Sequence, residues 1–229
     1  NDLTLKMYRQ FDYVGGSAVS DKEWLSSDSQ ENKISISDAE CVNDGLKFRL
    51  NIGKDSAVCE SKLIGRHNLT NILMSVQMAA SLGLNIVQIV KGISQVAPIE
   101  HRLQTIKLPT GITIIDDSYN SNESGAKIAI ETLAMFKGRK IVATQGIVEM
   151  GAEQERVNFE LGESIAKVAD VAILIGINKE NIRLGMLSGN FCDRNIYLVG
   201  HLDNAKELFG AMLKSGDVLL LQNDLPDNY

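Results

Sequence analysis

Alternating apolar and polar positions mark the first sixty residues. Residues 33–37 alternate, and segment 46–52 places its apolar side chains on one face. This period of about two predicts short strands. The Asn-Asp-Gly sequence at 43–45 predicts a tight turn between them, because these residues tolerate positive φ. With a further strand at about 57–64, the pattern predicts an antiparallel ribbon.

The period then lengthens to that of helices. Asn68 stands where an N-cap residue belongs, and the helix that follows it is predicted to stop near Gly83. A shorter helix is predicted over residues 86–94. Two amphipathic helices thus follow the ribbon.

The segment 96–100 is the predicted domain boundary. It contains Pro98, and the residue before a proline is disfavoured in a helix. The hydrophobic pattern also changes beyond this point. The chain is therefore divided into domains at 1–97 and 98–229.

The second domain alternates apolar strands with amphipathic helices. Near-continuous runs of Val, Ile and Leu between helices are typical of a parallel sheet covered on both faces. The pattern predicts an α/β fold, a Rossmann-like, doubly wound and mostly parallel sheet with right-handed crossovers. The predicted strands are 112–115, 141–144, 171–175, 196–199 and 218–221, and the predicted helices are 123–136, 153–169, 179–187 and 203–213.

Composition excludes several classes of protein. The 229 residues are 44% hydrophobic and carry a net charge of −6, which suits a globular protein and argues against a nucleic-acid partner. The three cysteines form no CxxC pair and the three histidines are scattered, so neither a metal site nor a disulfide framework is predicted. No apolar run approaches the roughly 20 residues of a membrane span. A reducing cytoplasm and no membrane association are expected.

The most polar stretch follows the strand predicted at 112–115. The sequence Asp-Asp-Ser-Tyr-Asn-Ser-Asn fills residues 116–122. Ligands bind beyond the carboxyl ends of strands in such sheets, where a carboxylate can bind a ribose diol and Tyr119 offers a flat face to a base. A structural explanation is also open, in which Asn122 caps the next helix and the aspartates bind backbone amides.

Three other segments are candidates with equally open alternatives. Arg102 could neutralise phosphate through paired donors, or form a surface salt bridge. Asn71 could read an adenine edge, whereas capping would explain Asn68 alone. The glycine-flanked loop 145–151 lacks a GxGxxG fingerprint, which disfavours a dinucleotide oxidoreductase.

Taken in order, these motifs resemble those of the Mur ligases. The segments are Gly-Arg-His-Asn-Leu-Thr-Asn at 65–71, the pair His101-Arg102, and the loop at 116–122. The resemblance is greatest to members that add D-Ala-D-Ala, whose loop usually reads DDSYNANP; this chain differs at Ser121 and Glu123. It extends over roughly residues 40–229.

The resemblance implies a chain that is part of a longer ligase. Residues 1–97 would be the end of a central ATP-binding domain, and 98–229 a whole C-terminal Rossmann-like domain. The family joins an amino acid to a UDP-muramoyl peptide with ATP and Mg²⁺, through an acyl phosphate. Its phosphate loop, magnesium-binding glutamate and histidine, and modified lysine lie upstream, and this chain has no GxxxxGK[ST] and begins at Asn1. The missing N-terminal domains are expected in the same or a partner chain.

The resemblance also assigns individual residues. Asn71 matches the family's adenine-contacting asparagine, Arg102 the catalytic arginine at the phosphates, and Asp117 the aspartate near the ribose. By itself the chain is not expected to hydrolyse ATP efficiently, and a hinge is expected near 97–101. The alternative is a non-catalytic binding module whose partner carries the ATPase half. The further nucleotide-binding candidates are Asn68, Tyr119 and Asn120.

Overall fold

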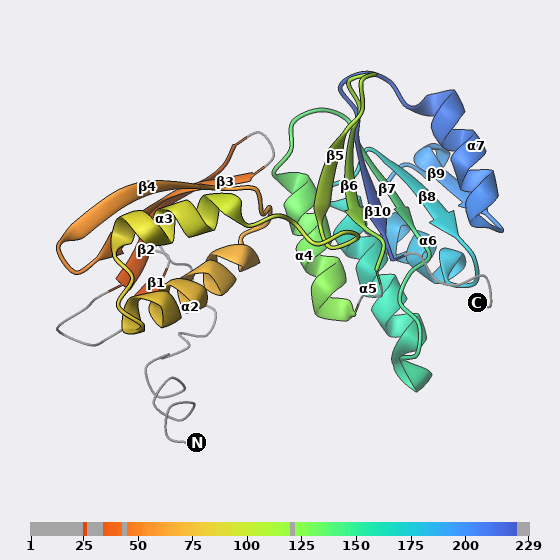
Figure 1. Ribbon diagram of the computed structural model, residues 1–229. Coiled ribbons are helices and arrows are strands. Elements are labelled where there is room, and N and C mark those ends of the chain that lie inside the picture. Colours follow the sequence, from red (N-terminus) through yellow and green to blue (C-terminus); the bar gives the residue numbers. More distant parts are fainter. Residues whose placement is uncertain (1–24, 27–33, 43–44, 120–121, 224–229) are drawn as a thin grey trace. The chain divides into compact units, whose positions relative to one another are not determined.

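The computed structural model describes residues 25–26, 34–42, 45–119 and 122–223. Its internal contacts divide the chain into two units, Asn1–Ala97 and Pro98–Tyr229. Each unit is described by itself (Figure 1). Within the described residues, no helix is long and apolar enough to cross a membrane.

The first unit is a four-stranded antiparallel sheet with two helices on it. The strands follow the order β1-β2-β3-β4. Leu46, Phe48 and Leu50 are buried in one core with residues of both helices, which confirms the predicted strand face. The turn residues Asn43 and Asp44 lie outside the described residues. The elements are β1 (Leu25–Ser26), β2 (Ile34–Val42), β3 (Gly45–Ile52), β4 (Asp55–Ser61), α2 (His67–Ser81) and α3 (Ile86–Gln95).

The start of α2 differs from the prediction. Asn68 is not the N-cap; Arg66 is, and it makes no side-chain capping bond. The chain already turns at Gly65, whose carbonyl accepts from the Asn68 amide at 3.1 Å. Asn68 therefore lies inside the first turn, where its side chain is available for other bonds. A capping box that the sequence analysis missed begins α3, where Asn85 and Gln88 bond each other's backbone amides.

The second unit is a six-stranded sheet in the order β5-β6-β10-β7-β8-β9. Five strands are parallel, and β5 pairs antiparallel with β6 at the edge. β10, the last strand in the sequence, lies between β6 and β7. The strands are β5 (Gln104–Lys107), β6 (Thr113–Asp117), β7 (Lys140–Thr144), β8 (Val171–Ile175), β9 (Ile196–Val199) and β10 (Val218–Gln222).

Helices cover both faces of this sheet (Figure 1). α7 packs on one face, over a core that includes Ile141, Ile173 and Leu219. The other α-helices lie on the opposite face, where α5 and α6 approach so closely that a Cβ on Gly185 would lie 1.9 Å from a carbonyl oxygen of α5. The helices are α4 (Glu123–Ala134), η1 (Gly151–Glu153), α5 (Gln154–Ala166), α6 (Lys179–Ser188), η2 (Asp193–Asn195) and α7 (Leu202–Met212).

The predicted α/β class and mostly parallel sheet are confirmed. The predicted parallel strands and their helices all form, with ends displaced by a few residues. The sequence did not predict β5, because its four residues, three half-buried and one exposed, lie at a sheet edge and show no clear period. It also predicted one helix from residue 153, whereas the chain enters α5 through the short 3₁₀ turn η1.

Candidate functional site

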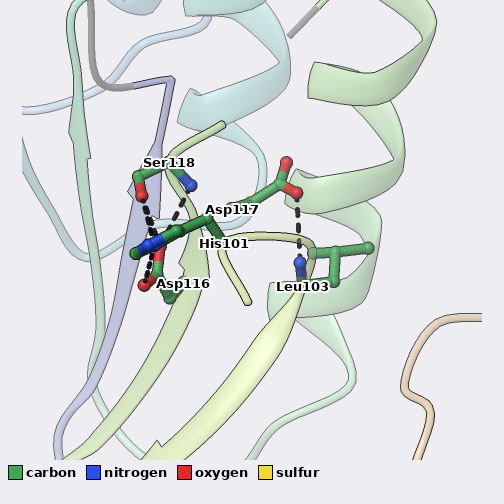
Figure 2. Close-up of polar contacts among 5 residues, drawn as sticks. All are labelled: His101, Leu103, Asp116, Asp117 and Ser118. Carbon is green, nitrogen blue, oxygen red and sulfur yellow. Dashed lines mark hydrogen bonds and ion pairs between the residues drawn. The ribbon is translucent and has the colours of Figure 1, made fainter. Parts of the chain in front are cut away.

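Two short segments lie against each other at the carboxyl end of β6. The carbonyl oxygen of His101 accepts a bond from the Tyr119 amide at 3.2 Å, and the Leu103 amide donates to Asp117 Oδ1 at 3.2 Å. His101 Nδ1 also lies 2.9 Å from Asp116 Oδ2 (Figure 2). We call residues 101–103 and 116–119, joined by these bonds, the clamp. The clamp places the predicted residues Arg102, Asp117 and Tyr119 in one small region.

The two adjacent aspartates have different surroundings. Successive side chains of a strand point to opposite faces, and Figure 2 shows Asp116 and Asp117 pointing apart. Asp116 is buried and accepts from the amide and the hydroxyl of Ser118, at 3.1 and 2.6 Å, in addition to its contact with His101. This bonding of a backbone amide is the structural role that the sequence left open for the aspartates.

The surroundings of Asp117 shift the pKa of its carboxyl group. Burial raises its pKa to about 6, and the nearby Asp116 charge acts in the same direction. The bond from Leu103 and the positive charge of Arg102 oppose this rise. Asp117 is therefore ionised at neutral pH, but its charge is held at a cost in free energy.

Arg102 lies over an aromatic ring. Its Cζ is 4.0 Å from the centroid of the Tyr119 ring, and the tyrosine side chain is exposed. Arg102 forms no ion pair with another described residue, so the surface salt bridge considered above is not seen there. A cation on an aromatic face keeps its N–H donors at the rim of the guanidinium group. Those donors are thus available to an anion.

A pocket of about 370 Å³ opens on the Asp116 side of the clamp. Its polar wall comes from the ends of β6, β7 and β10, and its apolar wall includes Leu202 and Phe209 of α7. The pocket lies at the carboxyl edge of a parallel sheet, where ligands of such folds bind. The polar residues that line it are His101, Asp116, Ser118, Thr144, Gln145, Lys206, Gln222 and Asn223.

The loop after β7, residues 145–151, is held by buried amides. Asn158 is 0% exposed, and its side chain bonds both the amide and the carbonyl of Ile147 at 2.8 Å. Asn178 donates to the carbonyls of Gln145 and Ile147. Gly146 has a φ of 78°, and a Cβ there would lie 2.3 Å from Asn158 Oδ1. This loop is a fixed structural element, and periodicity gave no signal for either asparagine.

The end of β10 reaches both loops. The Asn223 side chain donates to the Gly146 carbonyl, and the Asn223 amide donates to the Asp117 carbonyl at 3.1 Å. Thr144 donates its hydroxyl to Gln222 Oε1. Gln222 and Asn223 were not predicted from the sequence, because their partners lie from about eighty to more than a hundred residues away along the chain.

In the first unit, Asn68 and Asn71 form a bonded pair. Asn71 Nδ2 donates to Asn68 Oδ1 at 3.1 Å, and Asn68 Nδ2 donates to the Ile64 carbonyl at 2.7 Å. Asn71 is exposed and lines a mostly apolar pocket of about 240 Å³ between α2 and α3. Asn68 thus orients Asn71. Asn120, also predicted, lies outside the described residues.

Comparison with known proteins decides the family. The family model described as "Mur ligase, glutamate ligase domain" matches residues 101–222, more than half of the chain. The chain belongs to the Mur ligase family. The clamp lies at the start of the matched region, so the resemblance first seen in the motifs is confirmed.

Relatives of the Mur ligase chain are known in several bacteria. It is 27% identical to the UDP-N-acetylmuramoyl-tripeptide–D-alanyl-D-alanine ligase of Escherichia coli K12, over 76% of the chain and 39% of that protein. It is 30% identical to a UDP-N-acetylmuramoylalanine–D-glutamate ligase of Francisella tularensis subsp. mediasiatica, over 72% of the chain and 37% of that protein. The chain thus spans about two fifths of the length of these relatives.

Solved structures share the fold of the Mur ligase chain. MurF from Acinetobacter baumannii has a TM-score of 0.70 at 21% identity, over 83% of this chain and 42% of that one. MurF ligase from Thermotoga maritima, solved in complex with ADP, has a TM-score of 0.69 at 19% identity, over 82% and 42%.

Proposed function

We propose that the chain is the C-terminal part of a cytoplasmic, ATP-dependent ligase of peptidoglycan precursor synthesis. The proposed reaction adds D-Ala-D-Ala to UDP-N-acetylmuramoyl-tripeptide through an acyl phosphate. The observation that carries the proposal is the position of Arg102. Its guanidinium group lies on the ring of Tyr119 beside Asp117, and its N–H donors are available to an anion. The substrates are those in the name of the Escherichia coli relative. Residues 1–97 would be the end of the ATP-binding domain, and 98–229 the C-terminal domain.

The chemistry of the clamp suits a nucleotide. The guanidinium group of Arg102 can bind phosphate oxygens through two parallel bonds and neutralise the charge that develops in phosphoryl transfer. The Asp117 carboxylate can accept bonds from ribose hydroxyls at neutral pH, since its pKa is about 6. The ring of Tyr119 packs against the guanidinium group of Arg102 and restricts the conformations of the arginine side chain. ATP, when bound, supplies the phosphoryl group that activates the substrate carboxylate.

The first unit offers a surface for a base. Asn71 carries both a donor and an acceptor on its amide, which is the pattern needed to bind an adenine edge. The pocket beside it is lined mainly by aliphatic side chains, including Ile89 and Ile93, which suit a flat ring. We assign Asn71 to the adenine and Asn68 to its orientation, because Asn68 already binds both Asn71 and the backbone.

We place the magnesium ligands mainly outside this chain. Among the described residues, no group of three or more His, Cys, Asp or Glu side chains gathers in a form that could hold a metal ion. Mg²⁺ in ATP-dependent enzymes is usually bound by one or two carboxylates together with substrate phosphates. The upstream part of the ligase would supply those carboxylates.

Phosphate release by the full-length gene product tests the proposal. We expect release that requires ATP, UDP-N-acetylmuramoyl-tripeptide and D-Ala-D-Ala together. Replacement of D-Ala-D-Ala by D-glutamate, with UDP-N-acetylmuramoyl-alanine as acceptor, is the control for the reaction named in the Francisella relative. Activity only in the control would overturn the proposed substrate, and activity in neither would overturn the ligase.

Calorimetric titration of the 229-residue chain with ATP tests the binding-module alternative. The proposed ligase predicts no saturable binding by this chain alone, because the phosphate loop would lie upstream. Tight, saturable binding would favour a self-contained module instead.

A further inference from the structure

Arg102 stands between two residues with left-handed backbone conformation. The φ angles of His101 and Leu103 are 61° and 48°. Neither residue is glycine, and this conformation is unfavourable for an L-residue. Two such residues around one arginine indicate a backbone that the surrounding structure holds in place.

Each strained residue has its own anchor. The Leu103 side chain is buried, and the Leu103 amide donates to Asp117. Burial of a leucine side chain is favourable and can offset the strain at that position. His101 is exposed, so burial gives it no such compensation. Its anchors are the carbonyl bond to the Tyr119 amide and the imidazole contact with Asp116.

The hydrogen-bond pattern defines the role of the imidazole. The Ser118 hydroxyl donates to Asp116 Oδ1, so its proton is already used. His101 Nδ1 lies 2.9 Å from Asp116 Oδ2 and 3.2 Å from Ser118 Oγ, both of which can then accept. The proton must therefore lie on Nδ1. His101 donates to a carboxylate that is itself fixed in β6 (Figure 2).

We propose that His101 is a positioning residue: its bond to Asp116 and its left-handed backbone hold Arg102 on the ring of Tyr119. The same residue bonds the Tyr119 backbone, so it fixes both the arginine and the surface on which the arginine rests. In the ligase, to whose proposed function this role belongs, His101 presets Arg102 for the nucleotide phosphates. Preset charged groups avoid reorganisation during the reaction.

Three variants separate the backbone from the imidazole. His101→Asn keeps a residue that tolerates the left-handed region and has an amide donor for Asp116. His101→Gly keeps the backbone freedom and loses the donor. His101→Ala loses both. Asn190→Ala is the matched control, because Asn190 is another left-handed residue, with a φ of 60°, in the turn after α6.

The first measurement is NMR of the 229-residue chain, which needs no ligand. The side-chain protons of Arg102 should be shifted upfield by the Tyr119 ring, and Tyr119→Ala gives the value without the ring. We expect His101→Ala to move these shifts toward that value, His101→Asn to retain most of the wild-type shift, and the Asn190→Ala control to retain all of it. Equal wild-type shifts in the alanine, glycine and asparagine variants would overturn the proposal.

The second measurement is steady-state kinetics of the full-length ligase. We expect His101→Ala to lower kcat/KM for ATP by about tenfold to a hundredfold, with a higher KM, because small misplacements of a binding group have effects of this size. His101→Asn should restore much of the loss. A lower kcat at unchanged KM, equal in the alanine and asparagine variants, would show only a loss of folded enzyme and would overturn the role.

The two measurements separate this inference from the proposed function. A full-length protein without ligase activity would remove the function, while the NMR shifts would still decide whether His101 holds Arg102 on Tyr119. If His101→Ala does not fold, the asparagine and glycine variants decide the matter. Asparagine must then retain more of the shift than glycine.

Discussion

The clamp at the carboxyl end of β6 and the loop after β7 are both polar, but they use their polar groups differently. In the loop after β7, the buried amides of Asn158 and Asn178 bond the backbone directly. In the clamp, Arg102 and Tyr119 remain exposed, and Asp117 retains a charge that burial disfavours. Buried polar groups whose hydrogen bonds are all satisfied form a rigid support. Exposed hydrogen-bond donors, and a carboxylate whose pKa is raised by burial, are typical of a binding site.

The two loops also reach the left-handed backbone conformation with different residues. The loop after β7 uses Gly146 and Gly151, for which a positive φ has little cost, and one exposed residue, Glu149, with a φ of 63°. The clamp uses His101 and Leu103 for similar conformations. A residue with a costly conformation persists only where the surroundings hold it, and such residues cluster at functional sites.

Arg102→Ala is the sharpest test of the clamp as a binding site. We expect the turnover of the full-length ligase to fall by about 10²–10³-fold, as is typical for loss of a preset charged donor. Folding should be nearly unchanged, because Arg102 is exposed. The measurements are phosphate release and circular dichroism.

Arg156→Ala provides the matched control for that variant. Arg156 is also an exposed arginine, but its ion pairs with Glu153 and Glu160 are at the surface of α5 and η1. Its loss should leave turnover unchanged. An unaltered rate in Arg102→Ala would remove Arg102 from the site.

Asn158→Ala tests the loop after β7 as a structural support. The variant leaves the buried Ile147 amide without its acceptor and removes two donor bonds, to Ile147 and Gln154. We expect the free energy of unfolding to fall by about 3 kcal/mol, measured by urea titration. Asn195→Ala is the control, since its one exposed bond to the Asp170 carbonyl should contribute less than about 1 kcal/mol. Equal losses in both variants would contradict the structural role.

Asp117→Asn tests the cost of the charge in the clamp. The pKa of Asp117 is raised from 3.8 to about 6 in the folded chain, so the native state binds a proton more tightly than the unfolded state. Stability from this group is therefore present below pH 4 and is lost as the pH rises to about 6. The asparagine variant lacks this loss. Its Tm should exceed that of the wild type by about 2–4 °C at pH 7.

The pH dependence of that difference is the decisive observation. Thermal unfolding of both proteins between pH 4 and pH 7.5 should show the Tm difference growing with pH and levelling above about pH 6. A difference that shrinks as the pH rises would mean that Asp117 stabilises the fold as a carboxylate. The contrast between the two loops would then lose its electrostatic part.

Periodicity and motifs predicted much of this protein. The strand face at Leu46, Phe48 and Leu50 followed from alternation alone, because one face of an antiparallel sheet is buried. The alternating strands and helices of the second unit predicted a mostly parallel sheet. The order of the polar motifs indicated the family of the chain. It also predicted one site that contains Arg102, Asp117 and Tyr119.

Other features were missed because the local sequence is compatible with more than one structure. Asn68 has the residue type of an N-cap, yet the turn already begins at Gly65. Asn158 lies within a helix whose apolar stripe gave no reason to bury an amide. A buried asparagine is favourable only where the backbone of another loop supplies its partners.

The sequence by itself determined the class of fold, the parallel strands of the sheet and the membership of the Mur ligase family. Only the tertiary structure decided that β10 enters between β6 and β7 and brings Asn223 to both loops. Only the tertiary structure also joined His101 to Asp116 and placed Arg102 on Tyr119. The physical reason is the separation along the chain: periodicity reports which face of an element is buried, whereas these contacts join residues from about 15 to more than 100 positions apart.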